Sequence, residues 1–343
     1  MSEDPIGIIL GGKPEAIREA RRDFERLPID LDAADDPPPE MPARQRTIAH
    51  RVSVQGPGTF FGKATRTLTF EPTDQEGWWF DRTDLPDSLP VRVSIRNVWT
   101  TGQVVSNIVL RSGSPHNYVR LVEHIIALRL GSKIHNLLIK TDSGDPPLLT
   151  RYGREILEVL DSAGVKEFDR PVRYCTVKER VTLGGARGDF LTLAPFTGKA
   201  PAIRIDCGLN FRTAIGRQRI RFPVNDRHFR YGSEARTNTS LWKMLYCKSI
   251  GNLFADVRNL GYNRDNVLIA GRFGYFNRPK LMHNGKSLEA AWHRSTLDLL
   301  AALALIEEDL FVGDVISYKA GHRLDVEMIR LLVQHDLLTP VDF

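Results

Sequence analysis

Segments with strand patterns are followed by segments with helical patterns twice along this chain, once in each half. In the first half, apolar residues spaced three or four apart predict helices over residues 117–130 and 151–163. The second half repeats the order, with helices predicted at 241–260, 287–307 and 324–335. Alternating β-branched residues predict strands at 51–54, 66–70, 91–98, 104–110, 136–140, 172–177, 181–183, 190–193, 202–209, 218–224, 266–270 and 314–318. Such runs are typical of α+β layering, so we predict an α+β fold of two similar domains, each with β-sheets packed on helices in two layers.

The boundaries of the predicted domains follow from composition and length. The chain has 343 residues, which suits about two domains. We place domain I at residues 46–166 and domain II at 173–343, joined by a linker at 167–172, with a functional site at their interface. Residues 1–45 are predicted to form an acidic, Pro-rich extension that is partly disordered, because the run DDPPPEMP at 35–42 is unsuited to a core.

Charge is distributed unevenly along the chain. Residues 1–45 hold six basic and eleven acidic side chains, a net charge of −5, and because the whole chain carries +5, the remainder carries +10. Residues 199–236 alone hold nine basic and three acidic side chains. A basic surface of this size suits an anionic partner such as nucleic acid, acidic lipid headgroups or a phosphorylated substrate. The opposite charges also suggest that the N-terminal segment folds back over the basic surface.

Cysteine usage and hydropathy exclude several classes of protein. Cys175, Cys207 and Cys247 are far apart and odd in number, which argues against a disulfide framework or a Cys-rich zinc knuckle. No stretch approaches the ~18–20 apolar residues of a membrane span, and the N-terminus lacks the pattern of a signal peptide. We therefore expect a cytoplasmic protein without a transmembrane segment.

Three histidines beside other reactive side chains are the candidates for chemistry. His124 follows Glu123 in VEH, His293 begins the run HRSTLD that ends at Asp298, and His322 ends the run YKAGH. Imidazole and carboxylate groups are suitable zinc ligands, and a catalytic zinc site needs three of them plus an open position for water. A neighbouring Glu then serves as base and a further His as acid. Taken alone, each histidine is more simply a surface or capping residue.

Taken together, these motifs resemble those of a known family. The opening run RTIAHRVSVQGPG at 46–58, the VEH segment, the helix that begins at His293 and the closing run YKAGH at 318–322 occur in matching order. In these features the chain resembles the UDP-3-O-acyl-N-acetylglucosamine deacetylases, zinc amidases of lipid A biosynthesis. The resemblance implies two α+β domains with helices between two sheets, and an acylated nucleotide sugar as substrate. It leaves nucleic-acid binding through the basic segment as a weaker reading, because no reader motif is present.

The resemblance also implies roles for individual residues. It assigns His124, His293 and Asp298 to zinc, Glu123 to the general base and His322 to the acid that assists departure of the amine. Ser249 would stabilise the oxyanion, and Arg294 would supply positive charge beside it, although an N-cap and a solvated charge are equally simple readings of these two residues. Substrate phosphates would meet basic side chains, for which the candidates are Lys199, Arg204, Arg217 and Lys319.

One spacing departs from the family. Asp298 follows His293 by five residues where the family has four, so on a regular helix the two side chains would lie about 140° apart rather than about 40°. A single π-bulge would absorb the extra residue, and such bulges often occur at functional sites. Without one, zinc would have two protein ligands. The alternative to an active enzyme is therefore a catalytically degenerate homologue that binds such a ligand or a protein partner without hydrolysis. The oligomeric state is left open, a monomer included.

Overall fold

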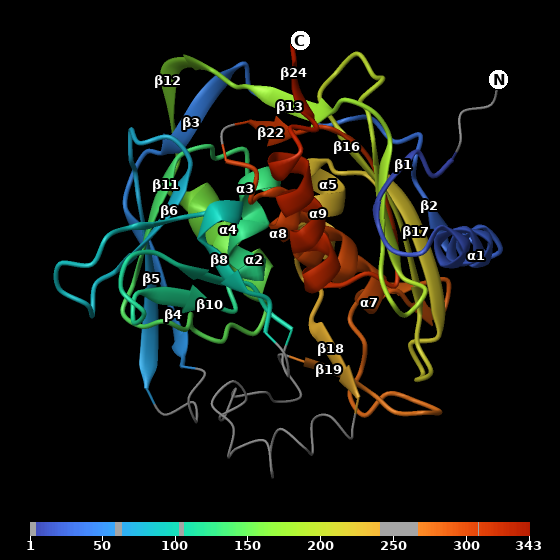
Figure 1. Ribbon diagram of the computed structural model, residues 1–343. Helices are drawn as coiled ribbons and strands as arrows, with labels where there is room; N and C mark the ends of the chain where they lie inside the picture. The colour runs from blue at the N-terminus through green and yellow to red at the C-terminus, as the bar shows by residue number, and fades with distance from the viewer. Residues whose placement is uncertain (1–4, 59–63, 103–105, 241–266, 308) are drawn as a thin grey trace.

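Helices lie between two large β-sheets in a computed structural model that describes residues 5–58, 64–102, 106–240, 267–307 and 309–343 (Figure 1). One sheet belongs to the first half of the chain, and the other is formed by the second half together with two strands from the N-terminus, so the expected α+β architecture is confirmed. The inward faces of both sheets and the helices between them share one continuous hydrophobic core. The two halves therefore bury their apolar faces against each other rather than forming separate cores.

The first half is built on a five-stranded sheet. Its strand order is β4-β5-β11-β6-β7, with β11 parallel to β6 and antiparallel to β5. Side chains alternate along β11, so that Leu137, Ile139 and Thr141 are buried while Leu138 and Lys140 are partly exposed, as expected of a sheet with one covered face. The elements of this half are β3 (Arg44–Ile48), β4 (Val52–Pro57), β5 (Thr65–Glu71), β6 (Trp78–Arg82), β7 (Val91–Arg92), η1 (Ile95–Asn97), β8 (Val98–Thr100), β9 (Val109–Arg111), β10 (Tyr118–Arg120), α2 (Glu123–Ile126), α3 (Leu128–Gly131), β11 (Leu137–Thr141), α4 (Tyr152–Ser162) and β12 (Val165–Pro171).

The second half is built on a seven-stranded sheet in the order β1-β14-β15-β23-β16-β17-β2. Its central strand β23 (Gly313–Tyr318) runs parallel to β16 and antiparallel to β15, and it ends four residues before His322. The other elements of this half are β13 (Tyr174–Val177), β14 (Val181–Gly184), β15 (Phe190–Ala194), β16 (Ile203–Asn210), β17 (Arg217–Pro223), α5 (Asp226–Gly232), β18 (Thr237–Ser240), β19 (Val267–Ala270), β20 (Met282–His283), β21 (Lys286–Ser287), α7 (Glu289–His293), η3 (Arg294–Asp298), α8 (Leu299–Leu303), β22 (Leu310–Phe311), α9 (His322–Gln334) and β24 (Leu338–Val341).

Residues 5–45 are part of the second sheet, contrary to our expectation of a separate, partly disordered extension. β1 (Ile8–Gly11) pairs in parallel with β14 at one edge, and β2 (Leu31–Asp32) pairs with β17 at the other. Between them, α1 (Pro14–Glu25) contacts β14, β15 and β23 on the outer side of the sheet (Figure 1). The helix can pack there because Ile17, Ala20 and Phe24 form an apolar face that is buried in the sheet.

The acidic charge of this segment explains how it is held. The carboxylates of Asp32 and Asp36 lie 3.4 Å from the guanidinium groups of Arg221 and Arg227, and the Asp30 carboxylate lies 2.7 Å from the Lys286 ammonium. The suggestion that the N-terminal segment folds back onto basic residues is thus confirmed. Because these contacts neutralise part of the basic segment, less of its charge is free for an anionic ligand.

Two local predictions were wrong. The linker expected at 167–172 lies mostly within β12, which pairs antiparallel with β3. The helix expected at 117–130 begins six residues later, because β10 occupies its first residues and Leu121 adopts a positive φ of 56° that no α-helix tolerates. The predicted helix at 241–260 lies outside the described residues. No helix in the described part of the chain has the length and apolar character to span a bilayer.

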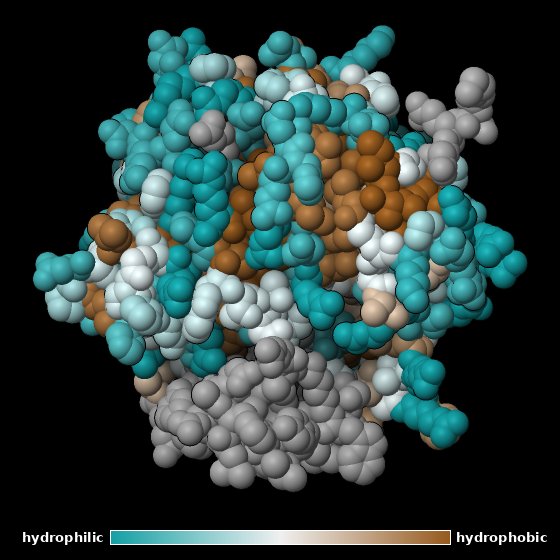
Figure 2. Space-filling model, in the orientation of Figure 1, coloured by the Kyte–Doolittle hydropathy of each residue, from teal (hydrophilic) through white to brown (hydrophobic). Residues whose placement is uncertain are grey.

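On the face of the molecule that Figure 2 shows, polar residues lie toward the edges and apolar residues near the centre. In the same view of Figure 1, α8 and α9 occupy this central region. The interior behind it is filled by large side chains. Trp78, Phe80, Phe222 and Trp292 are almost completely buried. The helices that carry the candidate histidines are therefore held in a close-packed environment.

Candidate active site at the domain interface

Glu123 and His124 open a short helix of the first half. α2 follows the left-handed turn at Leu121 and packs against α8 and α4, which fixes the direction of both side chains. The Glu123 side chain is buried, and its Oε1 accepts a hydrogen bond from the backbone N–H of Ile108. The carboxylate is therefore held in place while it keeps acceptor capacity for a second partner.

His293 and Asp298 lie at the two ends of a π-helical turn. η3 (Arg294–Asp298) joins α7 to α8 and has π-helical geometry, as the extra residue requires. The turn brings Oδ1 of Asp298 to 3.4 Å from Nδ1 of His293. The chain therefore does not form the regular helix that would turn Asp298 away from the site.

Two hydroxyl groups stabilise this turn. Oγ of Ser295 donates to the carbonyl of Ala291 at 2.7 Å, and Oγ1 of Thr296 donates to the carbonyl of Trp292 at 2.6 Å. Both bonds reach a carbonyl four residues earlier, which is where an α-helical N–H would donate. The two hydroxyls therefore tie the π-turn to carbonyls of the preceding helix, α7.

His322 completes the cluster from the first residue of α9. Lys319 has a φ of 54°, and this left-handed residue redirects the chain from β23 into the helix. Nε2 of His322 lies 3.4 Å from Oδ1 of Asp298 and 3.8 Å from Oε1 of Glu123. Its Nδ1 is buried and has no hydrogen-bond partner within the described ranges.

The three proposed zinc ligands fit a metal ion. One donor atom each from His124, His293 and Asp298 lies within 4.8 Å of the others, and Nε2 of His124 is 2.8 Å from Nε2 of His293. Oδ1 of Asp298 is buried and accepts no hydrogen bond from any side chain or backbone group that the structure describes. A buried carboxylate oxygen without a donor is costly, and a cation between two imidazoles would satisfy it.

The electrostatics suit this chemistry. Burial, followed by repulsion from His293, lowers the pKa of His124 to about 3, so its ring is neutral near pH 7 and able to bind metal. Burial would raise the pKa of Asp298, but the His293 and His322 rings outweigh it, and the carboxylate stays ionised. Burial raises the pKa of Glu123 above its ordinary 4.5, as a general base that operates near neutrality requires.

Thr237 is a site residue that the sequence analysis missed. Its Oγ1, at the start of β18, lies 3.0 Å from Nε2 of His293. The preceding residue, Arg236, forms a buried ion pair with Glu289 of α7 at 2.7 Å, which holds β18 beside the helix that carries His293. A single threonine has no pattern to mark it in the sequence, so only this packing reveals it. Ser249, which we expected to supply the hydroxyl, lies outside the described residues.

Arg294 does not face the cluster as a free charge, contrary to our expectation. Both of its Nη atoms lie 2.5 Å from the carboxylate oxygens of Asp325, and Nη2 also donates to Oγ of Ser317 at 3.2 Å. Burial would lower the pKa of this guanidinium, but Asp325 outweighs it and raises the pKa. The side chain is thus engaged in the core instead of being a solvated charge or a substrate contact.

Two of the four predicted substrate contacts are engaged elsewhere. Arg204 pairs with Asp314. Arg204 lies four residues before Gly208 on β16, and the carbonyl of Gly208 accepts a hydrogen bond from the backbone of Lys319. At 3.3 Å per residue, Arg204 is roughly 13 Å from this end of the strand. Nζ of Lys319 donates to the carbonyl of Arg187. Lys199 and Arg217 have exposed side chains, and their role in binding remains a prediction.

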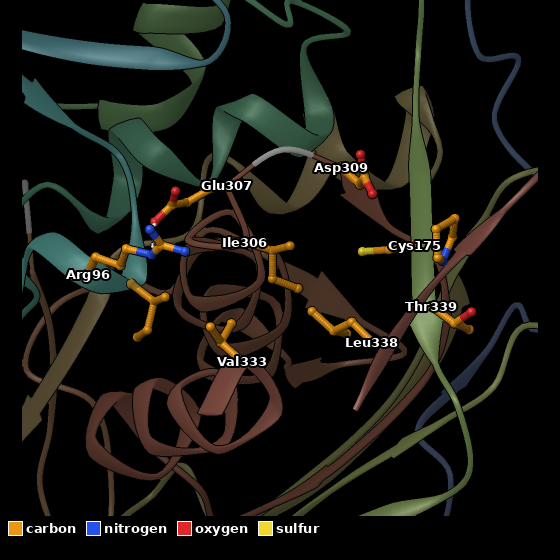
Figure 3. A pocket seen from close by; sticks show the side chains of 10 residues that line it. Arg96, Cys175, Ile306, Glu307, Asp309, Val333, Leu338 and Thr339 are labelled. Atoms are coloured by element: carbon orange, nitrogen blue, oxygen red, sulfur yellow. Dashed lines mark ion pairs between the residues drawn. The ribbon is translucent and has the colours of Figure 1, made fainter. Parts of the chain in front are cut away.

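One described cavity lies away from this cluster. It has a volume of about 210 Å³ and lies between η1 of the first half and the end of α9 and β24 of the second (Figure 3). Ile306 and Val333 line it, eight residues beyond Asp298 and eleven beyond His322. At 1.5 Å per residue, it is roughly 12–16 Å from the cluster along these helices. It contains none of the candidate catalytic groups.

Comparison with known proteins identifies the family. A model described as LpxC: UDP-3-O-acyl N-acetylglycosamine deacetylase matches residues 45–334. A protein named UDP-3-O-acyl-N-acetylglucosamine deacetylase from Bdellovibrio bacteriovorus is 29% identical over 289 residues, covering 83% of this chain and 88% of the relative. Proteins of the same name from Brucella ovis and Brucella abortus are 29% identical over 303 residues, covering 86% of this chain and 97% of each relative. The resemblance based on the motifs is confirmed.

Proposed function

Because the chain belongs to the family of UDP-3-O-acyl-N-acetylglucosamine deacetylases, we propose that it is a zinc-dependent N-deacetylase of an acylated, UDP-linked amino sugar in lipid A biosynthesis. The observation that carries the proposal is the convergence of His124, His293 and Asp298, with Glu123 and His322 beside them. The free, buried thiols of Cys175 and Cys207 suit a reducing compartment, and we propose the cytoplasm.

His124, His293 and Asp298 would hold the zinc ion. When bound, zinc supplies a Lewis acid that polarises the amide carbonyl and lowers the pKa of a water molecule. Two imidazoles and one carboxylate are three protein ligands, the number that leaves a position open in a tetrahedral catalytic site.

Glu123 and His322 would divide the proton transfers between them. Glu123 accepts the proton of the attacking water, a role that its buried, hydrogen-bonded carboxylate and raised pKa support. His322 donates a proton to the departing amine nitrogen. Nε2 of His322 and Oε1 of Glu123 are 3.8 Å apart, so both can reach one amide.

Thr237 would assist at the carbonyl oxygen. Its hydroxyl borders the ring of His293 and can donate a hydrogen bond to an oxyanion that develops there. In this role it replaces Ser249, which we first assigned from the sequence.

The test is hydrolysis of UDP-3-O-acyl-N-acetylglucosamine by zinc-loaded protein, followed through release of the free amine. Glu123→Gln is expected to lower kcat at least 100-fold because general-base catalysis typically contributes about 10²–10⁴. Zinc content should not change, since Glu123 is not among the three ligands. Glu327→Gln, a matched change on the surface of α9, should leave kcat unchanged. Absence of amine release by zinc-loaded wild-type protein would contradict the proposed function.

A further inference from the structure

The Arg294–Asp325 ion pair joins the two elements that bring Asp298 and His322 together. Arg294 is the first residue of the π-turn that ends at Asp298, and Asp325 lies in the first turn of α9, three residues after His322. The pair is bidentate, with both Nη–Oδ distances at 2.5 Å, and the two side chains are 5% and 0% exposed. One planar contact therefore fixes both the separation and the relative orientation of these helical segments.

A third element is tied to the same guanidinium. Nη2 of Arg294 donates to Oγ of Ser317, one residue before the end of the central strand β23. Beyond the strand, the chain continues through Lys319 into the helix that begins at His322. The pair thus holds the π-turn next to the end of β23 and next to the first turn of α9, the two elements on either side of the loop that leads to His322.

The position of His322 needs such support. Its Nδ1 has no hydrogen-bond partner among the described residues, so its ring is not oriented by an acceptor of its own. Its Nε2 faces the carboxylates of Asp298 and Glu123 at 3.4 and 3.8 Å. The location of the ring is consequently set by the backbone at the start of α9, where Asp325 is anchored.

The π-turn needs support as well. It is a local departure from the α-helix on either side, and a return to α-helical hydrogen bonding would rotate Asp298 away from His293. Arg294 is locked at the first residue of this turn. A buried ion pair is seldom a net source of stability compared with apolar residues of similar size, so its presence here is better explained by the arrangement that it specifies.

We propose that Arg294 and Asp325 are positioning residues that hold Asp298 of the π-turn and His322 of α9 in register for metal binding and proton transfer. The inference rests on the proposed function for its catalytic part, whereas its metal-binding part depends only on the three-ligand site. Neither residue needs to touch substrate, because both Nη atoms of Arg294 and both carboxylate oxygens of Asp325 are bonded to each other in the core.

The test replaces the whole pair by apolar residues of similar size, in the double variant Arg294→Met with Asp325→Leu. Because no unpaired charge is left in the core, we expect the variant to fold with an unfolding midpoint close to that of the wild type. We expect its zinc dissociation constant to rise at least tenfold, measured by competition with a chromophoric chelator. The visible absorption spectrum of the cobalt-substituted protein should change, since it reports the geometry of the ligands. In the deacetylation assay, kcat should fall at least tenfold with little change in KM.

A matched control removes an ion pair from the surface of the same helix. Glu327 and Arg330 of α9 are paired at 2.5 Å but are 44% and 39% exposed. Glu327→Leu with Arg330→Met should leave zinc affinity, the cobalt spectrum and kcat unchanged. If both double variants behave alike and like the wild type, Arg294 and Asp325 are not positioning residues.

A second variant covers the case in which the apolar replacement does not fold. Arg294→Lys keeps the charge but cannot form both hydrogen bonds to the carboxylate, so we expect a smaller loss of zinc affinity and kcat in the same direction. Wild-type values for Arg294→Lys would overturn the inference. A wild-type protein that binds zinc without hydrolysing the amide would contradict the proposed function alone, because zinc affinity and the cobalt spectrum still test the pair.

Discussion

Phe24 anchors the N-terminal helix, and Phe24→Ala should destabilise the whole protein rather than release a dispensable segment. The ring is fully buried, and its centroid lies 5.8 Å from the ring centroids of both Phe190 and Tyr318. The guanidinium of Arg219 stacks on it at 4.1 Å. Its contacts therefore join α1 to three strands of the seven-stranded sheet.

The expected magnitude follows from these contacts. Removing a buried Phe side chain costs about 3–5 kcal/mol through lost burial and the cavity that remains. Alanine recovers roughly 0.5 kcal/mol through its higher helix propensity. We therefore expect the free energy of unfolding to fall by about 3–4 kcal/mol, which shifts the urea midpoint by roughly 1 M at an m-value near 3 kcal/mol per M.

The assay is urea unfolding followed by circular dichroism, with Glu19→Ala as the control. Glu19 lies on the exposed face of the same helix, so its replacement should change stability by less than about 0.5 kcal/mol. If Phe24→Ala unfolds at the same urea concentration as Glu19→Ala, residues 5–45 do not contribute to the fold as we describe.

Three further predictions concern pH and catalysis. Burial, followed by the charges of Arg129 and Arg46, lowers the pKa of His135 to about 3, so below pH 6.5 the unfolded state binds more protons than the folded state. The free energy of unfolding should therefore fall by on the order of 2 kcal/mol between pH 6.5 and pH 5 because of this residue, and the urea midpoints of His135→Asn should lack this pH dependence. The raised pKa of Glu123 should place the acid limb of the kcat/KM profile above pH 4.5, and a limb at or below that value would exclude it as the base. Thr237→Val should lower kcat about 10²–10³-fold with zinc retained, and wild-type turnover would remove the hydroxyl from the mechanism.

Elements whose periodicity is set by one buried face could be predicted from the sequence. The predictions at 202–209, 218–224 and 314–318 match β16, β17 and β23 within a residue or two, since all three strands cover the core on one side. The helix predicted at 324–335 matches α9 except for its first turn. That turn has no apolar periodicity because it begins with His322, whose burial belongs to the site.

The remaining differences arise from contacts between distant residues. The N-terminal segment folds because β14, β17 and basic side chains far along the chain receive it. The five-residue interval from His293 to Asp298 is compatible with two helical geometries, and the sequence alone does not choose the π-turn that the chain forms. Arg294 was assigned to the site, with a solvated charge as the alternative, because its partner Asp325 lies 31 residues away and gives no local signal.

The central claim is that the π-turn makes Asp298 a third ligand beside His124 and His293. It is tested most directly by the position of zinc in crystals of the zinc-loaded protein, located by anomalous diffraction at the zinc edge. We predict one zinc ion per chain, with a carboxylate oxygen of Asp298 and a ring nitrogen of each histidine about 2.0–2.2 Å from it. A zinc ion bound elsewhere, or bound by the two histidines with the Asp298 carboxylate beyond about 3 Å, would contradict the account.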